Sequence, residues 1–267
     1  MYMKGVICYY SSAGNTRLAC KYIERKVSSC SFDLFNIHKD GAPGLDAYDV
    51  VGFATFTDFM TPALRMRQFI LDLKTQDGKP AFVFNTFGSN ASGGTLWHMR
   101  QLVGGKGFTV IAGHTLPCPE SFPPLIAEGK GFEEHPLPDE VAAFDRFIED
   151  LDQKLARITE GCEPEEDDLG IGVLTRLMSA PPRFFARRMM GQNKVDAERC
   201  TSCGTCERSC PYGAITVEGV PSFDEGKCQS CWACYNHCPT KAIFTSKLKD
   251  AGHYPRPNDH MKHVLGE

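Results

Sequence analysis

Two stretches near the end of the chain repeat one cysteine pattern: Cys200-Thr-Ser-Cys-Gly-Thr-Cys-Glu-Arg-Ser-Cys-Pro211 and Cys228-Gln-Ser-Cys-Trp-Ala-Cys-Tyr-Asn-His-Cys-Pro239. Three closely spaced cysteines can wrap a short loop around one face of a cubane, and a fourth ligand completes the site. This spacing is typical of thiolate ligands to [4Fe-4S] clusters. We therefore expect two [4Fe-4S] clusters with eight ligands: Cys200, Cys203, Cys206, Cys210, Cys228, Cys231, Cys234 and Cys238.

Zinc and disulfides are the alternative uses of so many cysteines. Structural zinc is usually held by two separated C-x2-C pairs, which a triplet with a delayed fourth cysteine does not resemble. A disulfide framework requires an oxidising compartment and is most common in short secreted chains. The chain has 267 residues and an odd count of 13 cysteines. The spacing and number of the cysteines therefore fit neither zinc ligands nor a disulfide framework well.

The overall composition is that of an ordinary soluble protein of about two domains, with 42% hydrophobic and 23% charged residues. The net charge of -4 indicates no excess of basic residues for binding nucleic acid, so we expect no nucleic-acid partner. No apolar run approaches the roughly 20 residues of a membrane span. The sequence enters a strand pattern at once, without a cleavable leader, which favours the cytoplasm of an anaerobic cell.

Residues 3–160 alternate strand and helix patterns. Apolar runs predict strands at 6–10, 31–37, 48–55, 79–86 and 107–113. Helical spacing of apolar residues predicts helices at 16–27, 63–73, 95–103 and 140–158. Near-continuous apolar strands that alternate with helices indicate an α/β domain with a parallel sheet covered on both faces.

The turn after the first strand carries a candidate anion site. It offers hydroxyls, one amide and a glycine at the beginning of a helix, where backbone N–H groups and the helix dipole favour a phosphate. It lacks the patterns of nucleotide and dinucleotide loops. A phosphate held by neutral donors is typical of flavin mononucleotide (FMN) sites. The candidate residues are Ser11, Ser12, Ala13, Gly14, Asn15 and Thr16.

The segment Tyr10-Ser-Ser-Ala-Gly-Asn-Thr16 resembles the phosphate loop of flavodoxins, S-x-T-G-N-T. With the paired cysteine runs, nearly the whole chain resembles the flavodoxin–ferredoxin fusion proteins. The resemblance implies a flavodoxin-like, doubly wound parallel five-stranded sheet of order 2-1-3-4-5, followed by a small α+β two-cluster ferredoxin domain. Ala13 departs from the usual threonine, which removes a hydroxyl donor contributing about 0.5–1.5 kcal/mol.

The same resemblance implies where the cofactors lie. FMN is expected at the carboxyl edge of the sheet, with its ring held by the loops after the third and fourth strands. In two-cluster ferredoxins the fourth ligand of each cluster comes from the opposite run, so Cys238 is expected to join the first run and Cys210 the second. The candidate ring-site residues are Thr55, Phe56, Thr57, Thr86, Phe87, Gly88, Asn90 and Gly93.

We expect four segments. Residues 1–160 form the flavodoxin-like FMN-binding domain, and residues 193–250 form the 2[4Fe-4S] ferredoxin domain. Between them, 161–192 form a linker and an interdomain helical segment, in which Pro181 and Pro182 divide two short apolar helices. The polar tail 251–267 suggests no role.

The favoured function is electron transfer between the two clusters and FMN and on to a redox partner, which is a protein or a small-molecule donor or acceptor. This function requires no catalytic residue. The first alternative is an FMN-dependent reductase of a small molecule fed by the clusters, with His98 or His114 as proton donor. The second is a flavin-free redox-sensing or interaction module. The sequence leaves open whether the protein is an enzyme.

Overall fold

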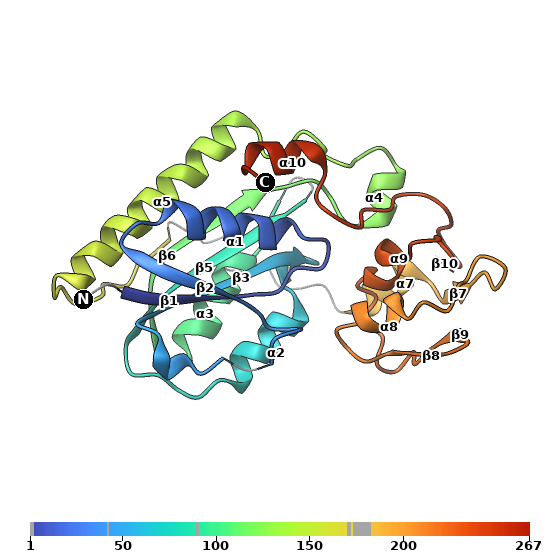
Figure 1. Ribbon diagram of the computed structural model, residues 1–267, viewed down its shortest axis with the longest axis horizontal. Coiled ribbons are helices and arrows are strands. Elements are labelled where there is room, and N and C mark those ends of the chain that lie inside the picture. Colours follow the sequence, from blue (N-terminus) through green and yellow to red (C-terminus); the bar gives the residue numbers. More distant parts are fainter. Residues whose placement is uncertain (1–2, 42, 89–90, 170–171, 173–182) are drawn as a thin grey trace.

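The computed structural model describes residues 3–41, 43–88, 91–169, 172 and 183–267. A larger α/β unit lies beside a smaller unit that carries the cysteine runs (Figure 1). In the part of the chain that the structure describes, no helix is both long and apolar enough to cross a membrane.

The larger unit is built on a parallel sheet of order β2-β1-β3-β5-β6. β4 is a two-residue strand that pairs antiparallel with the end of β3. Without β4, the strands have the flavodoxin-like order 2-1-3-4-5, so the predicted fold class is confirmed. The strands are β1 (Met3–Tyr9), β2 (Cys30–Asn36), β3 (Val50–Asp58), β4 (Thr61–Pro62), β5 (Lys79–Phe87) and β6 (Phe108–Pro117).

Helices cover both faces of this sheet (Figure 1). Successive strand residues point to opposite faces, so Ile7 packs with α1 (Asn15–Lys26) and α5 (Pro138–Thr159). Its neighbour Val6 packs on the other face with α2 (Leu64–Asp72) and α3 (Thr95–Gly104). The shorter helices of this unit are η1 (Leu45–Ala47) and α4 (Pro123–Ala127).

The smaller unit contains two short antiparallel strand pairs, β10-β7 and β8-β9. Its helices α8 and α9 each contain the third cysteine of one run and end just before the fourth. The elements are α7 (Arg183–Met190), β7 (Asn193–Val195), α8 (Thr205–Ser209), β8 (Ile215–Glu218), β9 (Val220–Phe223), α9 (Ala233–His237) and β10 (Ile243–Thr245).

Helix α7 packs on the smaller unit. Met190 is buried there with Trp232 and Ile215. In contrast, Phe184 and Phe185 are 62% and 50% exposed, so these rings do not fill an interface between the units. The first of the two predicted helices lies outside the described residues.

The C-terminal segment returns to the larger unit, where α10 (Asp259–Val264) lies beside α1 and α5 (Figure 1). Met261 and Leu265 are fully buried in the same core cluster as those two helices. Asn258 caps α10 by accepting the Met261 N–H at 2.8 Å. Residues 251–267 therefore form a strap from the cluster-bearing unit back to the flavodoxin-like unit.

Candidate functional site

The eight motif cysteines fall into two crossed groups. The first cluster set, around one small cavity, is Cys200, Cys203, Cys206 and Cys238. The second cluster set, around another, is Cys210, Cys228, Cys231 and Cys234. Each run thus contributes three cysteines to one cavity and its last cysteine to the other, which is the geometry of a two-cluster ferredoxin.

Backbone N–H groups point at the two crossing sulfurs in equivalent ways. Ala214 N–H donates to Cys210 Sγ at 3.3 Å, and Ala242 N–H donates to Cys238 Sγ at 3.2 Å. Such hydrogen bonds stabilise the negative charge of cluster sulfurs and tune the cluster potential. Among the described residues, no three His, Cys, Asp or Glu side chains converge closely enough for a single metal ion. The two crossed sets of four thiols, each with a backbone N–H group at its crossing sulfur, fit [4Fe-4S] clusters.

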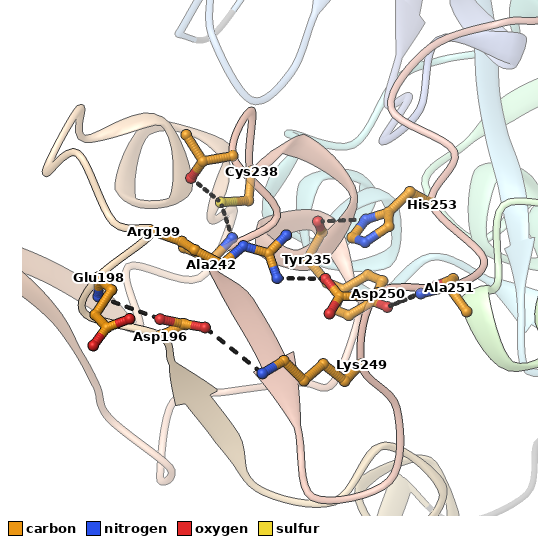
Figure 2. A network of polar contacts seen from close by, with 11 residues as sticks. Asp196, Glu198, Arg199, Tyr235, Cys238, Ala242, Lys249, Asp250, Ala251 and His253 are labelled. Carbon is orange, nitrogen blue, oxygen red and sulfur yellow. Dashed lines mark hydrogen bonds and ion pairs between the residues drawn. The ribbon is translucent and has the colours of Figure 1, made fainter.

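Figure 2 shows the polar contacts close to Cys238, including those that Tyr235 of α9 makes with the beginning of the strap. Tyr235 Oη donates to the Ala251 carbonyl at 2.6 Å, and the Tyr235 ring stacks on His253 at 4.2 Å. Arg199 Nη1 donates to Asp250 Oδ1 at 2.6 Å. The two Tyr235 contacts fix the beginning of the strap against α9.

The predicted phosphate turn lies at the carboxyl edge of the sheet, around a polar cavity of about 30 Å³ that we call the loop cavity. Gly14 has φ +104°, and a Cβ at this position would lie 2.7 Å from Pro257 Cδ of the strap. Only glycine therefore suits this position. The predicted residues that line the loop cavity are Ser11, Ser12, Ala13, Asn15, Thr16, Phe56, Thr57, Thr86, Phe87 and Gly88.

Several polar groups of this turn have protein partners. Asn15 Nδ2 donates to the Pro119 carbonyl at 3.0 Å, and Asn15 Oδ1 accepts from Tyr254 Oη at 2.9 Å. The hydroxyls of Thr16 and Thr86 share a hydrogen bond of 2.9 Å. The side chains of Asn15 and Thr16 thus shape the turn, which leaves the Ser11 and Ser12 hydroxyls and the first N–H groups of α1 as donors for an anion.

Helix α9 connects the cluster-bearing unit directly to this turn. His237 Nε2 donates to the Ser12 carbonyl at 2.9 Å, and Asn236 Nδ2 donates to the Ser121 carbonyl at 2.9 Å. Asn236 Oδ1 also accepts the Tyr254 N–H at 3.1 Å. Because α9 contains Cys234 of the second cluster set and ends just before Cys238 of the first, it joins both cluster sets to the walls of the loop cavity.

A larger cavity of about 240 Å³, the interdomain cavity, opens between the two units. Phe59 and Phe122 meet edge to face at 5.8 Å, and Phe122 and Trp232 do the same at 5.9 Å. These rings form an aromatic wall that continues from the β3–β4 turn to the second cysteine run. The interdomain cavity shares five lining residues with the loop cavity: Phe56, Thr57, Gly88, Glu120 and Ser121.

Two predicted ring-site residues lie elsewhere. Thr55 is fully buried, its hydroxyl contacts the Phe56 carbonyl at 3.4 Å, and it lines neither cavity. Gly93 packs against Met60, where a Cβ would lie 2.7 Å from the Met60 Cα. Asn90 lies outside the described residues.

Glu120 lines both cavities and was not identified from the sequence. Its Oε1 accepts the N–H groups of Ser121 and Phe122 at 2.8 and 2.9 Å. Burial nevertheless raises the pKa of this carboxyl above its ordinary value, more than these two hydrogen bonds lower it. A glutamate after the fifth main strand has no distinctive pattern, so only its place in the fold reveals it.

Neither histidine considered as a proton donor lines the loop cavity or the interdomain cavity. His114 stacks on Phe144 and Phe147 beneath α5, and burial lowers its pKa to about 4. His98 lies on α3 and lines neither cavity. Cys118 reaches the loop cavity, but burial raises the pKa of its thiol well above the ordinary range. It therefore behaves as a small apolar residue.

Comparisons with known proteins agree with the two-part organisation. Residues 193–216 and 221–244 each match the 4Fe-4S binding domain family, and together these ranges span less than half of the chain. They contain all eight cysteines of the two cluster sets. A search of curated proteins gave no match.

Flavodoxins are among the similar solved structures. A flavodoxin from Bacillus cereus is 15% identical, with a TM-score of 0.43 over 56% of this chain and 97% of its own. A variant of the Fusobacterium nucleatum flavodoxin, bound to flavin mononucleotide, is 18% identical, with a TM-score of 0.43 over 59% and 98%. Because these likenesses are distant, we infer the cofactor of the larger unit from its own residues. The chain joins a flavodoxin-like fold to a 4Fe-4S binding domain.

Proposed function

We propose that this protein transfers electrons between two [4Fe-4S] clusters and FMN, and from there to a redox partner. The observation that carries the proposal is that two residues line both the interdomain cavity and the cavity of the second cluster set. Cys231 and Trp232 line both the cavity of the second cluster set and the interdomain cavity. A ring bound in the interdomain cavity would therefore be separated from the second cluster by these two residues.

The residues around the two cavities fit FMN. The loop cavity offers neutral donors at a helix N-terminus for the phosphate, and the adjoining interdomain cavity offers aromatic walls for a planar ring. The side chains of Phe56 and Thr57 line both cavities, so one extended ligand can occupy both. The chain's role is to bind this ligand, orient its ring and exclude water between the ring and the second cluster.

The exposure of the cysteines suggests the order of transfer. Cys203 of the first cluster set is exposed, and the second set adjoins the interdomain cavity. We infer that the first cluster, held by the set that includes the exposed Cys203, would exchange electrons with a redox partner, and that the second cluster would pass electrons to or from a flavin in the interdomain cavity. When bound, each cluster exchanges one electron, and the flavin accepts two electrons together with protons. Two one-electron oxidations of the clusters thus balance one reduction of the flavin.

The chemistry of the site limits the partner and the compartment. The inferred partner is a one-electron carrier protein or a small one-electron donor or acceptor that reaches the exposed edge at Cys203. We place the protein in a reducing cytoplasm, because thiolate ligands must remain unoxidised. A reductase acting on a small substrate would need a proton donor beside the ring. Neither His98 nor His114 lines the interdomain cavity, whereas Glu120 does.

Anaerobic purification followed by iron, sulfide and flavin analysis tests this proposal. We expect about eight iron atoms and about one FMN per chain. Rapid mixing with a one-electron reductant should then bleach the cluster absorbance first and the flavin absorbance afterwards. Iron without any bound or bindable FMN would favour the flavin-free module. Saturable consumption of a small molecule by the reduced protein would favour the reductase.

A further inference from the structure

We propose that Trp232 is the positioning residue of the flavin site and that its indole N–H donates a hydrogen bond to an acceptor at the edge of the bound ring. This inference rests on the proposed function, because it assigns a partner within the same cavity. It also explains why a tryptophan lies between the cluster ligands Cys231 and Cys234. Ligation of a cluster does not by itself require a tryptophan at this position.

The indole of Trp232 has a buried donor without an acceptor. The residue is 2% exposed, and its Nε1 has no hydrogen-bond partner within the described parts of the chain. Buried tryptophan N–H groups usually have a partner, because leaving such a donor unpaired is costly. An acceptor supplied by a ligand resolves this cost, and the interdomain cavity that Trp232 lines is where a ligand can be.

The backbone and the neighbouring rings hold the indole in place. Trp232 is the N-cap of α9 with φ +60°, which is unusual for a bulky residue and is maintained by its surroundings. Phe122 and Tyr235 both pack edge to face against its ring, at 5.9 and 5.3 Å. Phe122 belongs to the flavodoxin-like unit, so the indole meets the side of the cavity that receives the flavin.

A sulfur of the second cluster is the competing acceptor, because Trp232 also lines that cavity. Two sulfurs of that set already have donors: Ala214 N–H to Cys210 at 3.3 Å and Asn193 Nδ2 to Cys228 at 3.6 Å. A flavin ring carries carbonyl oxygens and ring nitrogens at its edge, and these are stronger acceptors than sulfur. The difference in acceptor strength therefore favours the ring.

Trp232→Phe removes the N–H and keeps an aromatic side chain. The chain's other tryptophan, Trp97, lies on α3 and lines neither cavity, so Trp97→Phe is the matched control. In cluster-loaded protein from which flavin has been removed, we expect Trp232→Phe to raise the FMN dissociation constant about 2- to 12-fold in a fluorescence titration. The flavin midpoint potential should shift as well, while the iron content and the cluster EPR spectrum stay unchanged.

The possible outcomes distinguish an error in the assignment of Trp232 from an error in the proposed function. Unchanged FMN affinity and flavin potential in Trp232→Phe, with an altered cluster EPR spectrum, would assign the N–H to the cluster and overturn the inference. If Trp232→Phe loses its clusters, NMR of the unsubstituted protein labelled with ¹⁵N-tryptophan provides the test instead. FMN should then shift the Trp232 indole N–H resonance more than that of Trp97, and an unshifted resonance overturns the inference. Failure of the unsubstituted protein to bind FMN overturns the proposed function itself.

Discussion

Glu120 places a carboxyl group beside the expected binding site of an anionic phosphate. Burial raises its pKa, so the folded protein keeps this proton to a higher pH than the unfolded chain does. The resulting contribution to stability is complete below the ordinary pKa of 4.5 and is lost as the pH rises through the raised, folded value. Above that value, the ionised carboxylate should also repel the phosphate.

Glu120→Gln should therefore tighten FMN binding at neutral pH. The expected change is about 1 kcal/mol, or roughly fivefold in the dissociation constant, and it should disappear at low pH, where the native carboxyl is neutral. Titrations of FMN fluorescence across this pH range measure it, with Glu128→Gln on the exposed surface as the control. Equal affinities of the native and substituted proteins at all pH values would show that the carboxyl does not face the phosphate.

The crossed grouping of the cysteines leads to a separate prediction. Cys210 lies in the first run but belongs to the second cluster set. Cys210→Ser should therefore impair the cluster held mainly by the second run, and Cys238→Ser the cluster held mainly by the first. Iron analysis and EPR of reduced protein can check this. Electron transfer to FMN should fail more completely in Cys210→Ser, because its cluster adjoins the interdomain cavity.

At the scale of elements, the strands of the larger unit were predictable because apolar runs with turns between them suit a buried parallel sheet. The predicted run 79–86 became β5 (Lys79–Phe87), and 31–37 became β2 (Cys30–Asn36). Two residues that the strap buries in the core of the larger unit are Met261 and Leu265. They are separated by four positions in a polar segment too short for a reliable helical pattern. Their burial depends on a core more than a hundred residues away in sequence.

The candidate site was predictable to a similar degree. Motifs identified the cluster cysteines and the phosphate turn, since both require particular residue types at fixed spacing. Glu120, Phe122 and Trp232 are ordinary in sequence and acquire a role only because three loops and a cysteine run meet around one cavity. Such convergence depends on how the two units pack, which local patterns do not specify.

Helix α9 is the element whose contacts hold the units together. Asn236→Ala would leave the Ser121 carbonyl and the Tyr254 N–H without their present partners. We expect a loss of about 1–3 kcal/mol in the free energy of unfolding, since buried groups that lose their partners bear the desolvation cost. Anaerobic denaturant titration measures this, and the exposed Glu225→Ala should leave the midpoint unchanged. Equal midpoints for both variants would mean that α9 does not fasten the units.

At the scale of the whole molecule, the chain passes from the flavodoxin-like unit to the clusters and then returns as the strap. Tyr254 Oη donates to Asn15, and Pro257 contacts Gly14, so the strap lies on the phosphate turn itself. The flavin site is thus assembled from both ends of the sequence. Its affinity for FMN should depend on how firmly α10 is anchored.

Met261→Ala tests this dependence. Met261 is fully buried against the core formed with α1 and α5, so its truncation should cost about 2–5 kcal/mol of stability. Because loosening of α10 frees the strap, FMN affinity should fall in the same variant, although Met261 lines neither cavity. The exposed His263→Ala on the same helix is the control for both measurements. A Met261→Ala protein with lower stability and native FMN affinity would show that the strap stabilises the fold without shaping the phosphate turn.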